Sequence, residues 1–526
     1  MTTLGARRTS KRPSLGWLVL GVVIVVVIVM LVWVGLSRLA APSAPSAATY
    51  WPTNGWRTST PEEQSVDSVK LAAAVRAARQ QDMHLHSLFI VRNGAVLLDV
   101  PFYPYDGQSA HDLASVTKSV MTTLVAIAAA QGKLDLDAPM VSFFPDRVIA
   151  NRDAAKERIT VRHLASMASG LDSVGMAQDE GTLAAMVNSP DWVQFALDRK
   201  VVSEPGTQFV YDSPGMHLLS AILQKATGMT ALEFARQNLF EPLGIHDYNW
   251  ESDPQGITHG WGDLFLRPQD AAKIGYLWLN KGVWDGKQLV PQQWVEDSVK
   301  VQHKTGMGDD YGYGWWITPE SGTYSAEGRG GQNIKVVPSL NAIVVTTGGG
   351  FNYDALDPYL TATVGDPTRP LPPNPQGMAL LEAARKAVSE PPAAQPVPPL
   401  PDTARAISGK TYALKPNPLR LRSLGLDFDG SAEATMRLTF DDGQPDRLMK
   451  VGLDGVYRMA PAEYGLPSGQ RGSWLDERTF VLDYDGIANR DAYMFRMSFV
   501  DDRLIMLGRE RTRSDGVMVE GQATAP

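Results

Sequence analysis

Residues 111–132 read HDLASVTKSVMTTLVAIAAAQG, and this stretch determines which fold the chain is expected to adopt. A loop leads into Ser115, and the apolar run that follows is typical of a buried helix. Ser115 therefore lies at a helix N-terminus, where unpaired backbone N–H groups and the helix dipole favour negative charge. Lys118 follows one turn later on the same helix face, so its amine can reach the Ser115 hydroxyl. Such a pair joins a nucleophile to a group that can take its proton.

The same residues have a simpler interpretation. In that interpretation Ser115 only caps the helix, and Lys118 is a solvated residue of its first turn. Short Ser-x-x-Lys strings occur by chance in long chains, so the motif needs support from the rest of the sequence.

Length and composition indicate a globular protein with more than one domain. The chain has 526 residues, which is more than one ordinary core accommodates. Its 44% hydrophobic and 20% charged residues fit a folded protein, and the net charge of −8 gives no indication of nucleic-acid binding. Cysteine is absent, which excludes disulfides, thiolate metal sites and a cysteine nucleophile.

The N-terminal part of the sequence predicts a membrane anchor. Residues 17–36, WLVLGVVIVVVIVMLVWVGL, carry no charge and are long enough to cross a bilayer as a helix. Basic residues precede this run, namely Arg7, Arg8, Lys11 and Arg12. The positive-inside rule therefore predicts a single-pass protein with a cytoplasmic N-terminus and its body on the outer face of the cell membrane. The alternative is secretion after signal cleavage at the small residues APSAPSAA (41–48), but the apolar run is longer than a typical signal core.

The remaining pattern divides the chain into segments of different composition. We predict a cytoplasmic tail (1–15), an anchor or signal sequence (16–38), a linker (39–60), an α+β domain (61–389), a proline-rich linker (390–403) and an all-β, barrel-like domain (404–526).

The expected elements of the large domain suggest one sheet completed by distant segments. Two apolar runs in 87–102 flank Asn93-Gly94, a strong hairpin signal. Further strands are expected at 311–318, 333–338 and 341–347, and a closing helix at 378–389. Strands at both ends with helices between them predict an antiparallel sheet flanked by helices, an α/β arrangement of the α+β kind with a helical subdomain.

Residues 55–389 resemble the serine β-lactamase and penicillin-binding-protein fold. Within it the similarity is greatest to class C β-lactamase-related esterases, D-aminopeptidases and 6-aminohexanoate-dimer hydrolases. Five ordered stretches carry the resemblance: HDLASVTKSV (111–120), ITVRHLASMASGLDS (159–173), EPGTQFVYDSPGMHLLSAIL (204–223), LFEPLGI (239–245) and LFLRPQDAAKIGYLWL (264–279).

The resemblance implies roles for three residues. Ser115 matches the nucleophile, Lys118 its lysine, and Tyr211 the tyrosine of a Tyr-x-Asn motif. An ammonium beside a phenol favours the phenolate, so Lys118 and Tyr211 would share the proton of Ser115 and later deliver it to the leaving group. Which of the two is the formal base stays open.

A third family element is a strand that begins Lys/His-Thr/Ser-Gly. Lys304-Thr305-Gly306 matches this motif literally. However, it precedes YGYGWW (311–316), whereas the family's strand follows that segment. We therefore assign the element to Gly328–Gln332. Gln332 N–H would join Ser115 N–H as the oxyanion hole, and Gly330 and Gly331 would allow close approach to the substrate. Arg329 would then supply the positive charge that attracts a substrate carboxylate.

The sequence departs from the family at two positions. Ser213 replaces the usual Asn and removes an amide that contacts acylamido groups, and His259 occupies a typically glycine-rich loop, as a pocket residue or a structural one. The other histidines, including His84, His86 and His163, have no metal-ligand spacing. We therefore predict no metal and no cofactor.

These features predict a membrane-tethered, exported serine hydrolase that cleaves esters or amides through a Ser115 acyl-enzyme. Its expected partners are a small-molecule or short peptide substrate and the membrane, with peptidoglycan fragments as one candidate substrate. Two alternatives use the same residues. One is a peptidoglycan D,D-peptidase or D-aminopeptidase, and the other is a penicillin-binding sensor that is acylated without turnover. We expect residues 404–526 to modulate the chemistry rather than perform it.

Overall fold

The structure is a computed structural model that describes residues 50–81, 83–173, 176–361, 363–364, 369–441, 443–461, 466–511 and 516–524. The predicted cytoplasmic tail and the membrane anchor at 16–38 lie outside these ranges. Across the ranges that are described, every helix is too short or too polar to span a bilayer. Residues Trp51–Pro526 form one unit by their contacts.

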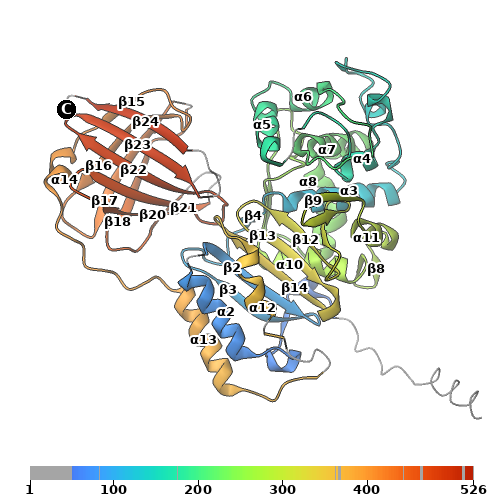
Figure 1. Ribbon diagram of the computed structural model, residues 1–526, viewed down its shortest axis with the longest axis horizontal. Coiled ribbons are helices and arrows are strands. Elements are labelled where there is room, and N and C mark those ends of the chain that lie inside the picture. The colour runs from blue at the N-terminus through green and yellow to red at the C-terminus, as the bar shows by residue number, and fades with distance from the viewer. Residues whose placement is uncertain are drawn as a thin grey trace, which may run out of the picture. The chain divides into compact units, whose positions relative to one another are not determined.

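A nine-stranded sheet organises the larger domain, and it is antiparallel except for the first pair. Its strands, in spatial order, are β1 (Arg57–Thr58), β3 (Ala95–Pro101), β2 (Leu85–Arg92), β14 (Ala342–Gly348), β13 (Gln332–Val337), β12 (Thr323–Gly328), β11 (Trp316–Thr318), β10 (Asp309–Tyr311) and β9 (His303–Met307). Strand β2 pairs with β14, so segments from the two ends of the domain lie side by side (Figure 1). The expected sheet, completed by distant segments, is confirmed.

The β2–β3 hairpin shows why its sequence folds as expected. Asn93 and Gly94 have φ values of 49° and 71°. Positive φ at both central residues is the geometry of the two-residue turn that matches strand twist, and Asn-Gly adopts it readily. Alternate residues of β2 then face opposite sides of the sheet.

Both sides of this sheet are covered by helices, which explains why its central strands are apolar on both faces. Phe89 and Val91 belong to one hydrophobic cluster, which also takes in the residues of α3 (Val116–Ala130) and α10 (Pro268–Leu279). Leu88 belongs to a second cluster on the opposite face. The helices of that face are α2 (Ser68–Gln80), α12 (Asp357–Thr361) and α13 (Pro375–Ser389).

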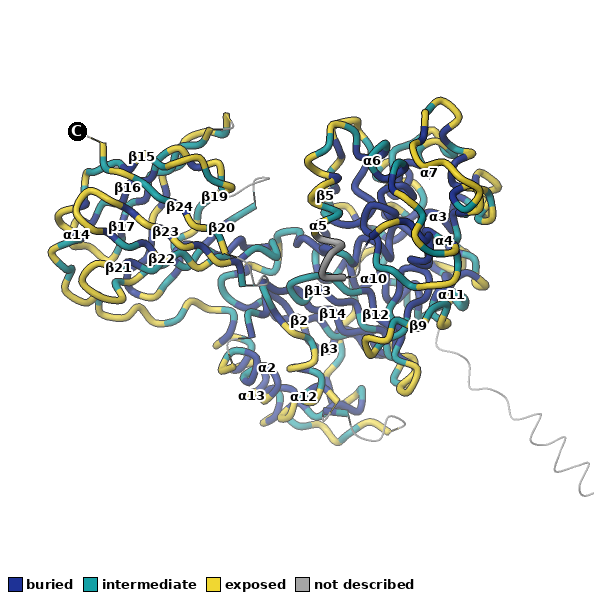
Figure 2. The backbone as a smooth tube through the Cα atoms, turned by 45° about the horizontal axis from the view of Figure 1, so that its top comes forward, coloured by how far each residue is buried: buried dark blue, intermediate teal, exposed yellow. Residues whose placement is uncertain are grey.

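The remaining helices and short strands of this domain surround α3. The helices are α4 (Val161–Ala165), α5 (Met176–Val187), α6 (Trp192–Asp198), α7 (Ser213–Thr227), α8 (Ala231–Ala235), α9 (Glu241–Leu243) and α11 (Gln292–Ser298). The short strands are β4 (His111–Asp112), β5 (Tyr248–Trp250), β6 (Leu264–Leu266), β7 (Val283–Trp284) and β8 (Lys287–Gln288). Every residue of α3 from Val116 to Ala128 is buried (Figure 2). Because this helix is buried on all sides, the position of Ser115 at its N-terminus is closely defined.

Residues beyond the proline-rich linker form a β-barrel, as expected. Its strands are β15 (Tyr412–Leu414), β16 (Leu421–Phe428), β17 (Glu433–Phe440), β18 (Arg447–Gly452), β19 (Arg458–Pro461), β20 (Pro467–Trp474), β21 (Thr479–Gly486), β22 (Ala492–Val500), β23 (Arg503–Glu510) and β24 (Gly516–Ala523). They form one ten-stranded sheet, and a further pairing between β18 and β20 closes it. A short helix, α14 (Asp402–Ile407), precedes the barrel.

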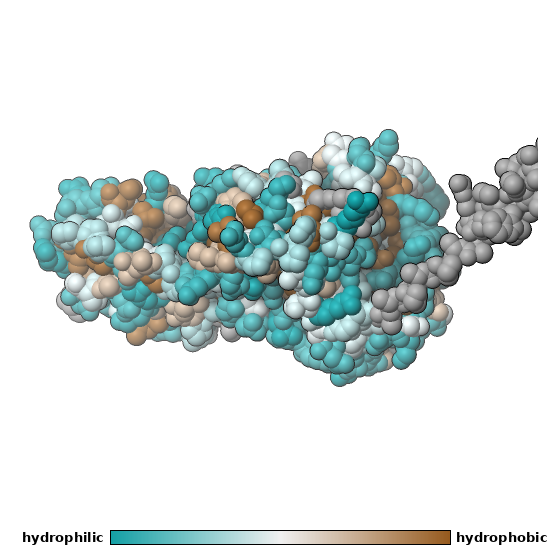
Figure 3. Space-filling view, turned by 90° about the horizontal axis from the view of Figure 1, so that it is seen from below, coloured by the Kyte–Doolittle hydropathy of each residue, from teal (hydrophilic) through white to brown (hydrophobic). Residues whose placement is uncertain are grey.

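The barrel strands show the inward–outward alternation that closure requires. In β23, Leu504 and Met506 are buried whereas Ile505 and Leu507 are exposed. The inward-facing side chains of the barrel, which include Leu504 and Met506, belong to one hydrophobic cluster. The face of the molecule drawn in Figure 3 is hydrophilic for the most part, with hydrophobic residues in small separate areas.

Candidate active site

Ser115 is held in place by the loop before it. Ala114 has φ of 47°, a left-handed conformation that is strained for a residue with a side chain. The Asp112 carboxylate stabilises this backbone by accepting a hydrogen bond from Ala114 N at 2.8 Å. The chain thus turns sharply from β4 into α3 with Ser115 at the junction.

The simpler interpretation of Ser115 and Lys118 does not agree with the geometry. Ser115 occupies the N-cap position of α3, but its hydroxyl makes no capping hydrogen bond. Lys118 is only 2% exposed. Its Nζ donates to Ser115 Oγ at 2.8 Å and to the carbonyl oxygen of Trp261 at 2.9 Å. The amine is therefore held against the hydroxyl rather than solvated.

Tyr211 completes the group that the sequence predicted. Lys118 Nζ lies 4.8 Å from the centroid of the Tyr211 ring, and that ring stacks on Trp316 with 6.1 Å between centroids. The next residue, Asp212, caps α7 through Gly215 N. Asp212 also accepts two hydrogen bonds from the buried guanidinium of Arg199, at 2.8 and 3.0 Å. This ion pair fixes the start of α7 and with it the position of Tyr211.

The β12–β13 hairpin contacts Ser115 through Gly328 rather than through Gln332. A Cβ added to Gly328 would lie 3.0 Å from Ser115 N and 2.5 Å from Leu113 O. The Gln332 side chain instead bonds to the Gly348 backbone, with its Nε2 2.7 Å from Gly348 O. Within the predicted element, Gly328 to Gln332, the residue that lies beside the Ser115 amide is therefore Gly328.

Arg329 does not offer a free charge to a substrate, contrary to expectation. Its guanidinium pairs with Glu510 and, at 3.3 Å, with Asp491. Both carboxylates belong to the barrel, so the positive charge is already compensated. The prediction that Arg329 attracts a substrate carboxylate is therefore wrong for this arrangement.

The structure also shows the contacts of the other predicted site residues, His259 and Ser213, and the position of Lys304. His259 Nδ1 lies 2.8 Å from Asp263, and its ring stacks on Trp261 at 4.4 Å between centroids. Ser213 is buried in the first turn of α7. Lys304 is exposed on β9, the last strand in the sheet order, which agrees with its exclusion from the site.

Gly330 and Gly331 lie in the turn between β12 and β13, with φ values of 89° and 94°. A Cβ on Gly330 would lie 3.1 Å from Cβ of Arg490, and a Cβ on Gly331 would lie 2.6 Å from the Phe351 backbone. These glycines therefore allow the turn to pack closely against neighbouring chain segments.

Arg490 is the residue near this site that the sequence did not reveal. It lies in the turn between β21 and β22, and its guanidinium pairs with Asp112 and, at 3.3 Å, with Asp263. Burial raises the pKa of Asp112 to about 6 even though Arg490 opposes the shift. Burial would also raise the pKa of Asp263, but His259 and Arg490 hold it at about 2. No motif marks such a turn, because its partner Asp112 lies 378 residues earlier.

Two further histidines near this site, His86 and His111, form a buried pair. His86 Nδ1 lies 2.8 Å from His111 Nε2, and burial lowers the pKa of His86 to about 3. Among the residues that the structure describes, no group of three or more His, Asp or Glu side chains is arranged to hold a metal ion.

Several known proteins are similar in sequence to this chain. The sequence model of the beta-lactamase family matches residues 71–365. The 6-aminohexanoate-dimer hydrolase of Paenarthrobacter ureafaciens is 24% identical over 288 residues, which cover 51% of this chain and 73% of that protein. Esterase EstB of Burkholderia gladioli is 26% identical over 218 residues, or 36% of this chain and 55% of its own length.

A solved structure of a penicillin-binding protein from Bacillus halodurans aligns with a TM-score of 0.46 and 17% identity, covering 55% of this chain and 99% of that one. The family match spans more than half of the chain and contains Ser115, Lys118 and Tyr211. The chain therefore belongs to the β-lactamase family and is a serine hydrolase.

Proposed function

We propose that this hydrolase cleaves ester or amide bonds through an acyl-enzyme on Ser115, with Lys118 and Tyr211 as its proton-transfer pair. The observation that carries the proposal is the 2.8 Å contact between Lys118 Nζ and Ser115 Oγ inside a buried helix. Similarity to a 6-aminohexanoate-dimer hydrolase, whose substrate is joined by an amide bond, and to an esterase supports both bond types.

In the proposed reaction, Ser115 Oγ attacks the carbonyl carbon while its proton passes to the Lys118–Tyr211 pair. The pair then donates that proton to the departing alcohol or amine, which leaves an ester on Ser115. Water then attacks this ester and loses a proton to the same pair. The pair returns that proton to Ser115 Oγ as the bond to the acyl group breaks, which releases the carboxylic acid and free Ser115.

The negative oxygen of each tetrahedral intermediate needs two hydrogen-bond donors. Ser115 N–H is one candidate, because it donates to no acceptor within the part of the chain that is described. We place the second donor on the backbone at the end of β12, since Gly328 approaches Ser115 N. Gln332 N–H, the donor expected from sequence, is the alternative.

We also propose that the domain lies outside the cytoplasmic membrane, tethered by residues 16–38. This rests on the charge-free run and the basic residues before it. Protease added to intact spheroplasts should remove the chain beyond about residue 40. Cleavage that occurs only after lysis would contradict this topology.

A fluorophosphonate probe followed by mass spectrometry tests the assignment of the nucleophile. We expect the adduct on Ser115 and none in Ser115→Ala. Ser119→Ala is the matched control, because Ser119 lies on the same helix and bonds to Gly314 O. An adduct on Ser119, or labelling that survives in Ser115→Ala, would refute the assignment.

A substrate panel separates the candidate functions. We expect hydrolysis of short p-nitrophenyl esters in preference to D-Ala-D-Ala peptides and to the β-lactam nitrocefin. Turnover of D-Ala-D-Ala peptides alone would assign a peptidase, and a penicillin adduct that persists without any turnover would assign a sensor.

A further inference from the structure

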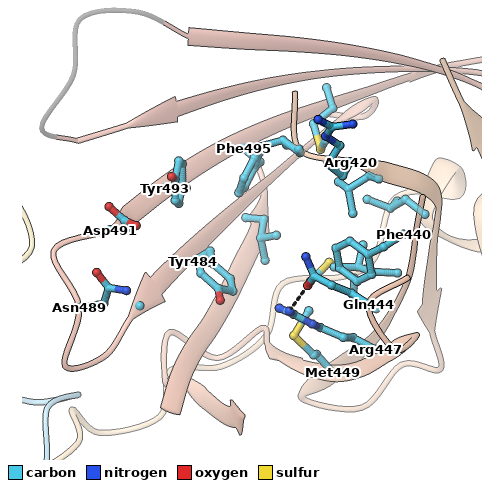
Figure 4. A pocket seen from close by; sticks show the side chains of 18 of the residues that line it. Arg420, Phe440, Gln444, Arg447, Met449, Tyr484, Asn489, Asp491, Tyr493 and Phe495 are labelled. Carbon is cyan, nitrogen blue, oxygen red and sulfur yellow. Dashed lines mark hydrogen bonds between the residues drawn. The ribbon is translucent and has the colours of Figure 1, made fainter. Parts of the chain in front are cut away.

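The barrel contains a cavity of about 360 Å³ that the proposed chemistry does not use. Its walls come mainly from inward-facing apolar side chains of β16–β18 and β21–β23 (Figure 4). These residues include Leu424, Met436, Met449, Leu482, Phe495 and Met497. Protein interiors are normally close-packed, and an apolar space of this size is suited to an apolar ligand.

One end of the barrel is closed. Phe428 and Phe480 pack there with 5.4 Å between ring centroids, and Trp474 lies 5.4 Å from each of them. Ala404 and Ile407 of α14 are buried in the same cluster. Most residues that line the cavity come from the opposite ends of the strands, so a ligand would enter from that side.

The open end carries positive charge. Arg420 and Arg447 line the cavity there. Arg447 donates to Gln444 Oε1 at 2.7 Å and lies 4.9 Å from the Phe440 ring centroid. Within the described residues, neither guanidinium pairs with a carboxylate. The carboxylate of Asp491, also at this end, is paired with Arg329.

We propose that this cavity binds an unbranched alkyl chain of medium length that ends in a carboxylate. The alkyl chain would lie between the methionine, leucine and aromatic side chains. These side chains would then make van der Waals contacts that they lack when the cavity is empty. The carboxylate would lie between Arg420 and Arg447, whose planar guanidinium groups suit a bidentate acceptor. The barrel would thereby have a ligand of its own, and the proposal does not depend on the reaction at Ser115.

Isothermal titration calorimetry on the full-length Ser115→Ala protein tests this proposal, because hydrolysis cannot then contribute to the signal. Decanoate should bind with one-to-one stoichiometry and a negative heat-capacity change. Decanol and decyltrimethylammonium should bind at least about tenfold more weakly, because each lacks the charge-assisted hydrogen bonds. Equal affinity for all three ligands, or no binding of decanoate, would overturn the proposal.

Two sets of variants locate the site. Arg420→Gln combined with Arg447→Gln should weaken decanoate about tenfold and leave decanol unchanged. Met449→Trp should abolish binding by filling the cavity, whereas Leu448→Trp should not, because Leu448 is the neighbouring residue of β18 and is 71% exposed. If Met449→Trp fails to fold, the arginine double variant and the comparison of the three ligands still test whether the cavity binds decanoate. Undiminished decanoate affinity in the arginine double variant would refute the site.

Discussion

Arg490 and Asp112 form an ion pair between the barrel and the loop that positions the nucleophile. Asp112 is 1% exposed and also bonds to Ala114 N, directly before Ser115. Arg490 reaches Asp263 as well, and Asp263 bonds to His259. A residue of the barrel therefore pairs with two carboxylates of the hydrolase domain close to the nucleophile.

Arg490→Ala should lower both the melting temperature and kcat/KM for p-nitrophenyl acetate. Removing one partner of a buried ion pair leaves an uncompensated charge and costs about 3–5 kcal/mol. We expect a loss of at least about tenfold in kcat/KM, since the Asp112–Ala114 bond loses its support. Arg490→Lys should keep part of the kcat/KM that Arg490→Ala loses. Arg496→Ala, on the exposed side of β22, is the control, and equal behaviour of the two alanine variants would contradict the role of Arg490.

Activity should fall as the pH is lowered through about 6, the raised pKa of Asp112. Above this pH the carboxylate is ionised and pairs with Arg490, and below it protonation removes the negative charge. Asp112→Asn keeps an acceptor for Ala114 N but cannot form the ion pair, so it imitates the protonated state at every pH. Its kcat/KM should be lower at pH 8 by roughly tenfold and should lack the step near pH 6. A step that persists in Asp112→Asn belongs to another group.

Lys118→Ala and Tyr211→Phe should each remove most of the activity, and the double variant should lose little more than the worse single one. Residues that act as a unit are strongly non-additive. The close approach of Lys118 Nζ to the Tyr211 ring is the structural reason to expect this coupling. Single-turnover acylation measures it directly. Additive losses in the double variant would show that the two residues act separately.

Gly328→Ala should slow acylation and also lower the melting temperature, because the added Cβ would lie 2.5 Å from Leu113 O and 3.0 Å from Ser115 N. The strand end must then move away from the Ser115 amide, which widens the oxyanion site. Gly181→Ala is the control, since its Cβ would meet nothing within 4 Å. If Gly328→Ala acylates as fast as the wild type, β12 does not supply an oxyanion donor.

The parts of the site that could be predicted are those set by local geometry. Ser115 and Lys118 lie one helical turn apart, so their contact follows from the helix alone. The Asn93-Gly94 turn likewise dictates its own hairpin. In GRGGQ (328–332), by contrast, several residues permit close approach, and only the three-dimensional register identifies Gly328 as the one beside Ser115.

Long-range pairs were not predictable in the same way. The sequence around Arg329 does not reveal its acidic partners, and only the fold brings Glu510 and Asp491 close to its guanidinium. Arg490 lies in a short polar turn of the kind that occurs between many strands. The sequence of such a turn does not predict that Arg490 pairs with Asp112 and Asp263. The positions of these two aspartates depend on how β4 and β6 pair in the folded chain.

The position of Arg490 near the end of the chain has a consequence for biosynthesis. A ribosome makes residues 61–389, which include Ser115, Lys118 and Tyr211, before it makes the barrel. The cation between Asp112 and Asp263 emerges only 378 residues after Asp112. A nascent chain that has not yet reached Arg490 carries its nucleophile without that support. Full activity should therefore appear only in chains that have been completed through the barrel.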